Sequence, residues 1–131
     1  REFPFANKVD CALAEPIDES WVTPDILGIG RVQGTAPAQI GIDVQKSGRS
    51  TGVTTGTIKA VNVTLMVSFG LLRKLRFENQ ILTTNMSAPG DSGSLVLDRQ
   101  NRAVGLLFAG SDSVTVVNPI EPVLDALNVR F

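Results

Sequence analysis

The sequence predicts an all-β domain that ends in one C-terminal helix. Short runs rich in Val, Ile, Leu and Thr are separated at short intervals by Gly, Pro and Ser, as in antiparallel sandwiches and barrels. In residues 61–68 the period of two marks a strand with one buried face, since Val61, Val63, Leu65 and Val67 alternate with Asn62, Thr64, Met66 and Ser68. Only the last apolar stripe repeats at helical spacing.

Eight strands are predicted, and turn residues bound each of them. Gly56 lies inside the longest, where it predicts a bend or a bulge. Residues 14–25 carry two prolines and four acidic side chains and are predicted to be a linker. The predicted strands are 9–14, 27–32, 39–45, 53–67, 72–83, 94–97, 103–108 and 114–117.

The C-terminal helix is predicted from its start signal and from its apolar face. Asn118 is the expected N-cap, Pro119 lies in the first turn, and Glu121 completes a pattern like a capping box. Four apolar residues fall at positions i, i+3, i+4 and i+7 of one face, namely Ile120, Val123, Leu124 and Leu127.

Composition excludes several classes of function. With 131 residues the chain suits one domain or two very small ones, and a net charge of −1 argues against a dedicated nucleic-acid binder. It has one cysteine, Cys11, and no histidine, so we expect no intrachain disulfide, no metal and no cofactor. The lack of disulfides favours a reducing compartment. No run of about 18 apolar residues is present, so we expect no membrane partner.

Residues 88–96, Ala-Pro-Gly-Asp-Ser-Gly-Ser-Leu-Val, place a serine between glycines just before an apolar strand. Such glycines let backbone amides approach a substrate carbonyl, so Ser92 is a candidate nucleophile and the amides of Gly90 and Ser92 are a candidate oxyanion hole. A serine needs a base to take its proton, and the chain has no histidine. On composition alone, an ordinary turn is the favoured interpretation.

The order of four segments along the chain favours the catalytic interpretation. The serine loop resembles the nucleophile loop of the chymotrypsin-like serine proteases. Residues 44–64 are similar to the start of the second barrel in the streptogrisin and α-lytic protease branch. Residues 105–111 resemble the substrate-binding strand of that family, and residues 7–14 resemble the stretch that carries the triad aspartate. The resemblance implies an antiparallel β-barrel, the second barrel of a double-barrel fold, with a C-terminal helix.

The resemblance also implies roles for individual residues. Ser92 is the nucleophile of a serine endopeptidase, and Asp10 is the carboxylate that orients the histidine. Asp10 lies among apolar residues, where a buried carboxylate needs a partner; the alternative is the solvent face of an edge strand. Lys46 is the implied partner of Asp91 in supporting the oxyanion loop, and the alternative is an ordinary solvated lysine.

The implied substrate pocket has no acidic residue at its base, so the resemblance favours a small or medium apolar side chain over Arg or Lys. Met86 is either part of this pocket or core filler. A peptide is expected to pair with the pocket strand as an added strand. The residues implied to contact the substrate are Met86, Ser87, Phe108, Ala109, Gly110 and Ser111.

Three departures from the family pattern are visible. The catalytic histidine is missing, Gln45 and Thr55 stand where relatives carry a disulfide, and Phe108 replaces a serine. We therefore expect a C-terminal part of a protease, with residues 1–25 as the end of the first barrel and the linker, and 26–131 as the second barrel.

This chain alone is expected to be inactive and to need an N-terminal barrel fragment that supplies the histidine, or to form a homodimer. The alternatives are a catalytically dead, peptide-binding pseudo-protease and a self-processing protein that cleaves once.

Overall fold

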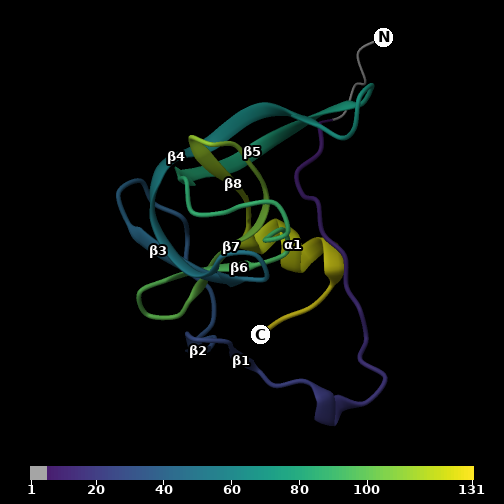
Figure 1. The fold of residues 1–131 in the computed structure, drawn as a ribbon, viewed down its shortest axis with the longest axis vertical. Coiled ribbons are helices and arrows are strands. Elements are labelled where there is room, and N and C mark those ends of the chain that lie inside the picture. The colour runs from purple at the N-terminus through teal and green to yellow at the C-terminus, as the bar shows by residue number, and fades with distance from the viewer. Residues whose placement is uncertain (1–5) are drawn as a thin grey trace.

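The structure of the chain is a computed structural model that describes residues 6–131, and its body is a closed antiparallel barrel of six strands (Figure 1). Around the barrel the order is β3-β4-β5-β8-β7-β6, and the pairing of β3 with β6 closes it. The all-β prediction with a C-terminal helix is confirmed. The six strands are β3 (Asp43–Gly48), β4 (Gly52–Ser68), β5 (Lys74–Thr84), β6 (Leu95–Asp98), β7 (Ala103–Gly110) and β8 (Val114–Pro119).

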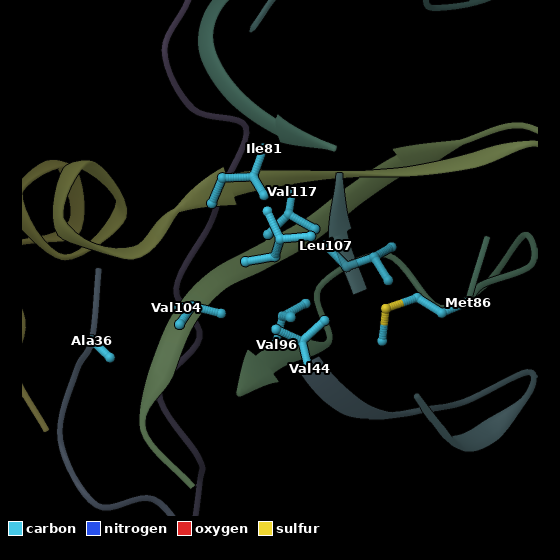
Figure 2. Close-up of a cluster of buried hydrophobic side chains, with 9 residues drawn as sticks. Ala36, Val44, Ile81, Met86, Val96, Val104, Leu107 and Val117 are labelled. Atoms are coloured by element: carbon cyan, nitrogen blue, oxygen red, sulfur yellow. The ribbon is translucent and has the colours of Figure 1, made fainter. Parts of the chain in front are cut away.

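The barrel interior is filled by apolar side chains, most of which come from the six strands. Figure 2 shows these side chains pointing toward one another between the strands. A second cluster forms around Phe77 and Phe108, whose ring centroids lie 4.8 Å apart. The buried members of the main core are Ala36, Val44, Ile58, Ile81, Met86, Val96, Val104, Leu107 and Val117.

The β4–β5 hairpin is the longest pairing and extends beyond the barrel (Figure 1). Its register shifts between Ile58 and Leu65, and Asn62 there has a φ of 54°. The bend predicted at Gly56 is therefore misplaced, because Gly56 pairs regularly with Val44. The glycine serves close packing instead: a Cβ at this position would lie 2.9 Å from the Met86 sulfur.

The predicted strand 9–14 is wrong, because the N-terminal segment has no free strand edge to follow. Among residues 6–14 only Asn7 pairs, in a single parallel bridge with Phe77 of β5. From Ile81 onward β8 takes that edge of β5, so the segment leaves the sheet. It then runs down one side of the barrel as irregular chain (Figure 1). The remaining N-terminal elements are η1 (Glu19–Trp21), β1 (Asp25–Ile26) and β2 (Gly30–Arg31).

The helix α1 (Ile120–Leu127) follows β8 directly, and Ile120 and Val123 bury its apolar face. Pro119 occupies the N-cap position, where no side chain caps the helix. The prediction that Asn118 is the cap is wrong, because Asn118 belongs to β8 and its side chain bonds elsewhere. Asn128 ends the helix in the left-handed conformation. No helix within residues 6–131 is long and apolar enough to cross a membrane.

Candidate active site

The loop that carries Ser92 joins β5 to β6 and owes its shape to two glycines. Gly90 has a φ of 100° and Gly93 a φ of 91°, values that L side chains rarely adopt. A Cβ on Gly90 would also overlap the Ser50 hydroxyl, which donates to the Pro89 carbonyl over 2.6 Å. The sequence of the loop is therefore required by its backbone conformation and by its contact with residues 49–51.

Asp91 anchors this loop from inside. Its side chain is 0% exposed and accepts hydrogen bonds from four donors. Burial alone raises the pKa of Asp91, but the hydrogen bonds outweigh burial and hold the pKa well below its usual range. Asp91 is therefore a buried carboxylate that stays ionised. The donors are the Thr51 hydroxyl (2.6 Å) and the amides of Ser50 (2.8 Å), Ala88 (3.0 Å) and Thr51 (3.1 Å).

Lys46 provides the countercharge from β3. It is also 0% exposed, and its ammonium lies 3.6 Å from the Asp91 carboxylate. The ammonium donates to the Gly52 carbonyl at 2.8 Å and to the Thr51 hydroxyl at 2.5 Å. Thr51 thus bridges the two charges, since its hydroxyl accepts from Lys46 and donates to Asp91.

Neither Thr51 nor Ser50 was predicted as a site residue. The sequence carries no signal for them, because the tight turn of residues 48–52 brings their donors to one point only once β3 and β4 are paired. Nothing in the spacing of the chain alone indicated that residues about 40 positions further on would meet these donors.

Ser92 lies exposed at the outside of the anchored loop. Its hydroxyl donates to the Phe108 carbonyl over 3.3 Å. The neighbouring amides of Asp91, Gly93 and Ser94 are engaged within the protein. The amides of Gly90 and Ser92 donate to no residue between 6 and 131, so two N–H groups beside the serine are available for a ligand oxygen.

Asp10 is exposed and lies outside any strand, so the interpretation of a buried carboxylate with a partner does not hold within the described chain. Its backbone amide donates to Asn118 Oδ1 over 2.9 Å. Asn118 of β8 pairs with Leu106 of β7, two residues before Phe108. The strand pair β7–β8 therefore connects the Asp10 segment to the carbonyl that holds Ser92.

The residues implied to contact substrate lie on β7 and just before the serine loop. β6 pairs with β7 only as far as Leu106, so no strand within residues 6–131 pairs with the edge of residues 108–110 that lies next to Ser92. Their other edge is covered, since Ala109 and Gly110 pair with β8. Ser111 ends the strand in a turn in which its amide donates to the Val114 carbonyl.

Met86 and Ser87 lie against β8, where both contact the Thr115 hydroxyl. Met86 is 4% exposed and belongs to the main core. The Ser87 and Thr115 hydroxyls lie 2.7 Å apart, and Thr115 is fully buried. Phe108 is also largely buried, and its ring packs against Phe77.

The low pKa of Asp91 predicts acid sensitivity. A carboxylate whose folded-state pKa lies below the unfolded value of about 3.9 stabilises the fold at neutral pH, and this stabilisation is lost as pH falls below about 4. We expect the difference in unfolding free energy between the wild type and Asp91→Asn to shrink steadily below that pH. Urea denaturation from pH 2 to 7 measures it. The exposed Glu15→Gln serves as a control, and a constant difference would contradict the prediction.

No cluster of three or more potential metal-binding side chains occurs among the described residues 6–131.

Comparisons with known proteins show that the chain has the fold of bacterial chymotrypsin-like serine proteases. No protein-family model matches it. It is 32% identical over 109 residues to Serine protease 1 of Streptomyces fradiae, an alignment that covers 79% of this chain and 29% of that protein. The solved chymotrypsin of Cellulomonas bogoriensis is 34% identical, with a TM-score of 0.66, over 79% of this chain and 57% of the other.

Protease A of Thermobifida fusca is 27% identical, with a TM-score of 0.70, over 82% of this chain and 60% of the other. The chain therefore spans less than two thirds of the length of each of these proteins.

Proposed function

We propose that this chain, which has the fold of the bacterial chymotrypsin-like serine proteases, carries the nucleophile half of a serine endopeptidase site. The observation that supports this proposal most directly is the geometry of the serine loop. Ser92 is exposed beside the amides of Gly90 and Ser92, which have no partner within residues 6–131, and the buried Lys46–Asp91 ion pair holds the loop in place. This is the arrangement that acyl transfer to a serine requires, since a donor pair stabilises the oxyanion as it forms.

In the proposed reaction Ser92 Oγ attacks a peptide carbonyl, and the amides of Gly90 and Ser92 bind the resulting oxyanion. The hydroxyl proton passes to a histidine that this sequence does not contain. The Asp10 carboxylate orients that histidine and stabilises its charged form. The free edge of residues 108–110 holds the peptide as an added strand.

The histidine must come from another polypeptide region, and we propose an N-terminal barrel. A homodimer of this chain would bring no histidine, so it would cover apolar surface without completing the site. Exposed apolar side chains along residues 13–27 support a partner that covers this segment. They are Leu13 (65% exposed), Ile17 (93%), Trp21 (72%), Val22 (59%) and Leu27 (85%).

Chemical rescue tests the proposal on the chain as it is. We expect a fluorophosphonate to label the purified chain slowly, and added imidazole to accelerate the labelling because it supplies the missing base. Denaturing intact mass and peptide mapping should place one adduct on Ser92. Ser92→Ala should abolish the labelling, whereas Ser111→Ala, an exposed serine on the neighbouring strand, should retain it. Labelling that is independent of imidazole or spread over several serines would sink the proposal.

A peptide-binding pseudo-protease is the second candidate, and the missing histidine and the Ser92–Phe108 hydrogen bond favour it. A peptide boronate and the matching peptide carboxamide separate the two. The endopeptidase site should bind the boronate much more tightly, because boron bonds to the serine and its oxygen occupies the amide pair. Equal affinities would favour the pseudo-protease.

A further inference from the structure

Two buried side-chain amides lie between the Asp10 segment and the barrel wall. Gln80 of β5 and Asn118 of β8 are both 0% exposed. The Asn118 Nδ2 amide donates to Gln80 Oε1 over 2.6 Å, which joins the two strands through their side chains. Buried side-chain amides are stable only where their polar atoms have hydrogen-bond partners. The partners of the remaining Gln80 and Asn118 atoms therefore indicate what the pair does.

The remaining atoms of the pair bond to the N-terminal segment and, in one contact, to β5 itself. Gln80 Nε2 donates to the Lys8 carbonyl over 2.8 Å and to the Glu78 carbonyl over 2.7 Å. Asn118 Oδ1 accepts the Asp10 amide over 2.9 Å. The pair thus provides a donor and an acceptor for two backbone groups that no strand pairs with.

These are the last hydrogen bonds that hold the segment. Asn7 is held by its bridge to β5, with its amide 2.9 Å from the Arg76 carbonyl. Beyond Asp10, residues 11–17 make no hydrogen bond to any part of the chain that the structure describes. The position of the Asp10 backbone is therefore set by Asn7 on one side and by the amide pair on the other.

We infer that Gln80 and Asn118 are positioning residues that fix the Asp10 segment relative to Ser92. The route is short: Asn118 lies opposite Leu106 on β7, and β7 continues to Phe108, whose carbonyl accepts the Ser92 hydroxyl. The inference rests on the proposed function, because only that function gives the Asp10 carboxylate a catalytic role. The attachment of the Asp10 segment to the barrel depends only on the hydrogen bonds of Gln80 and Asn118.

Cys11 provides a built-in reporter because it is the only cysteine and follows Asp10 directly. Its thiol is half-buried, and burial, followed by the Asp10 charge, raises its pKa above the usual value. Iodoacetamide reacts with the thiolate, so the rate of alkylation against pH reports both access and pKa. Release of the segment should raise the rate and move the profile to lower pH.

Asn118→Leu removes the acceptor for the Asp10 amide at nearly constant side-chain size. We expect alkylation of Cys11 about tenfold faster at pH 8, as the loss of one buried hydrogen-bond partner implies. The midpoint of the rate–pH profile should shift downward. Gln80→Leu removes the donor to Lys8 and should act in the same direction, so the test survives if one variant fails to fold.

Thr83→Val is the matched control. Thr83 is a fully buried polar residue of β5 like Gln80, but its hydroxyl donates only to the Thr84 carbonyl at 2.8 Å. We expect it to lower global stability while leaving the rate and pH profile of Cys11 unchanged. The inference is overturned if both amide variants leave Cys11 as it is in the wild type, or if Thr83→Val accelerates alkylation equally. Because Ser92 is not probed, these outcomes are separate from those of the fluorophosphonate test.

Discussion

Replacing Lys46 with methionine is expected to lower the free energy of unfolding by about 3 to 5 kcal/mol. The methionine fills similar space, but the Asp91 carboxylate, which is 0% exposed, loses its only ion-pair partner within the described residues. A buried ion pair can be close to neutral in net energy. Removing one partner is costly because it leaves a charge without compensation. Urea denaturation at neutral pH measures the change.

Two further variants isolate the cause. Lys59→Met alters an exposed lysine of the neighbouring strand β4 and should change stability by less than about 0.5 kcal/mol. The double variant Lys46→Met/Asp91→Asn removes both charges and should be more stable than Lys46→Met alone. If Lys46→Met costs no more than Lys59→Met, the buried pair does not hold the serine loop.

Gly105→Ala is expected to destabilise the barrel by about 3 kcal/mol or to prevent folding. Gly105 lies in β7 opposite Pro119, and a Cβ there would overlap both a methyl group of Val117 and the backbone oxygen of Asn118. Val117→Ala would remove the overlapping methyl group, but it would leave a cavity in the main core and would not relieve the overlap with the Asn118 backbone oxygen. Adding Val117→Ala to Gly105→Ala is therefore not expected to restore the lost stability. Thermal and urea unfolding measure both variants.

Gly110→Ala is the control for this prediction, since it lies at the exposed end of the same strand. An added Cβ there would lie 3.2 Å from the Ser87 hydroxyl and the Val114 carbonyl, a contact that small shifts relieve. We expect it to cost much less than Gly105→Ala. Equal effects would mean that general strand propensity, rather than the contact with β8, sets the requirement for glycine.

The sequence predicted five of the six barrel strands to within about two residues because each has its own local pattern. The strand predicted at 39–45 lies at Asp43–Gly48 instead, and the strand predicted at 27–32 is wrong because two short strands, Asp25–Ile26 and Gly30–Arg31, stand there. The alternation along 61–68 and the turns around β6, β7 and β8 are visible without tertiary contacts. The strand expected at 9–14 failed for a nonlocal reason: its residues suit a strand, but β8 already occupies the edge of β5. The cap expected at Asn118 failed because a buried partner, Gln80, competes for the same side chain.

The candidate site divides in the same way. The glycines around Ser92 were visible because positive φ values demand them locally. Lys46 and Asp91 were paired through a family resemblance, and the structure brings them to 3.6 Å. Thr51, which bridges them, and the Gln80–Asn118 pair carried no local signal. Their roles depend on hydrogen-bond partners that are distant in the sequence and meet them only in the folded chain.

The closure of the barrel has a consequence for how the molecule opens. β3 and β6 pair through only two residue pairs, Val44 with Asp98 and Gln45 with Leu97. Nearby support comes from the Gln45 amide, which donates to Asn101 Oδ1 over 3.0 Å and to the Asp98 carbonyl over 3.4 Å, and from an exposed Arg99–Asp43 ion pair. Sub-global unfolding follows the joins with the fewest contacts, so amide protons along this seam should exchange before those of β5 and β8. Lys46 follows Gln45 directly on β3, whereas Asp91 precedes β6. The cooperative unit that opens first therefore includes the anchor of the serine loop, and the site is locally less stable than the barrel that supports it.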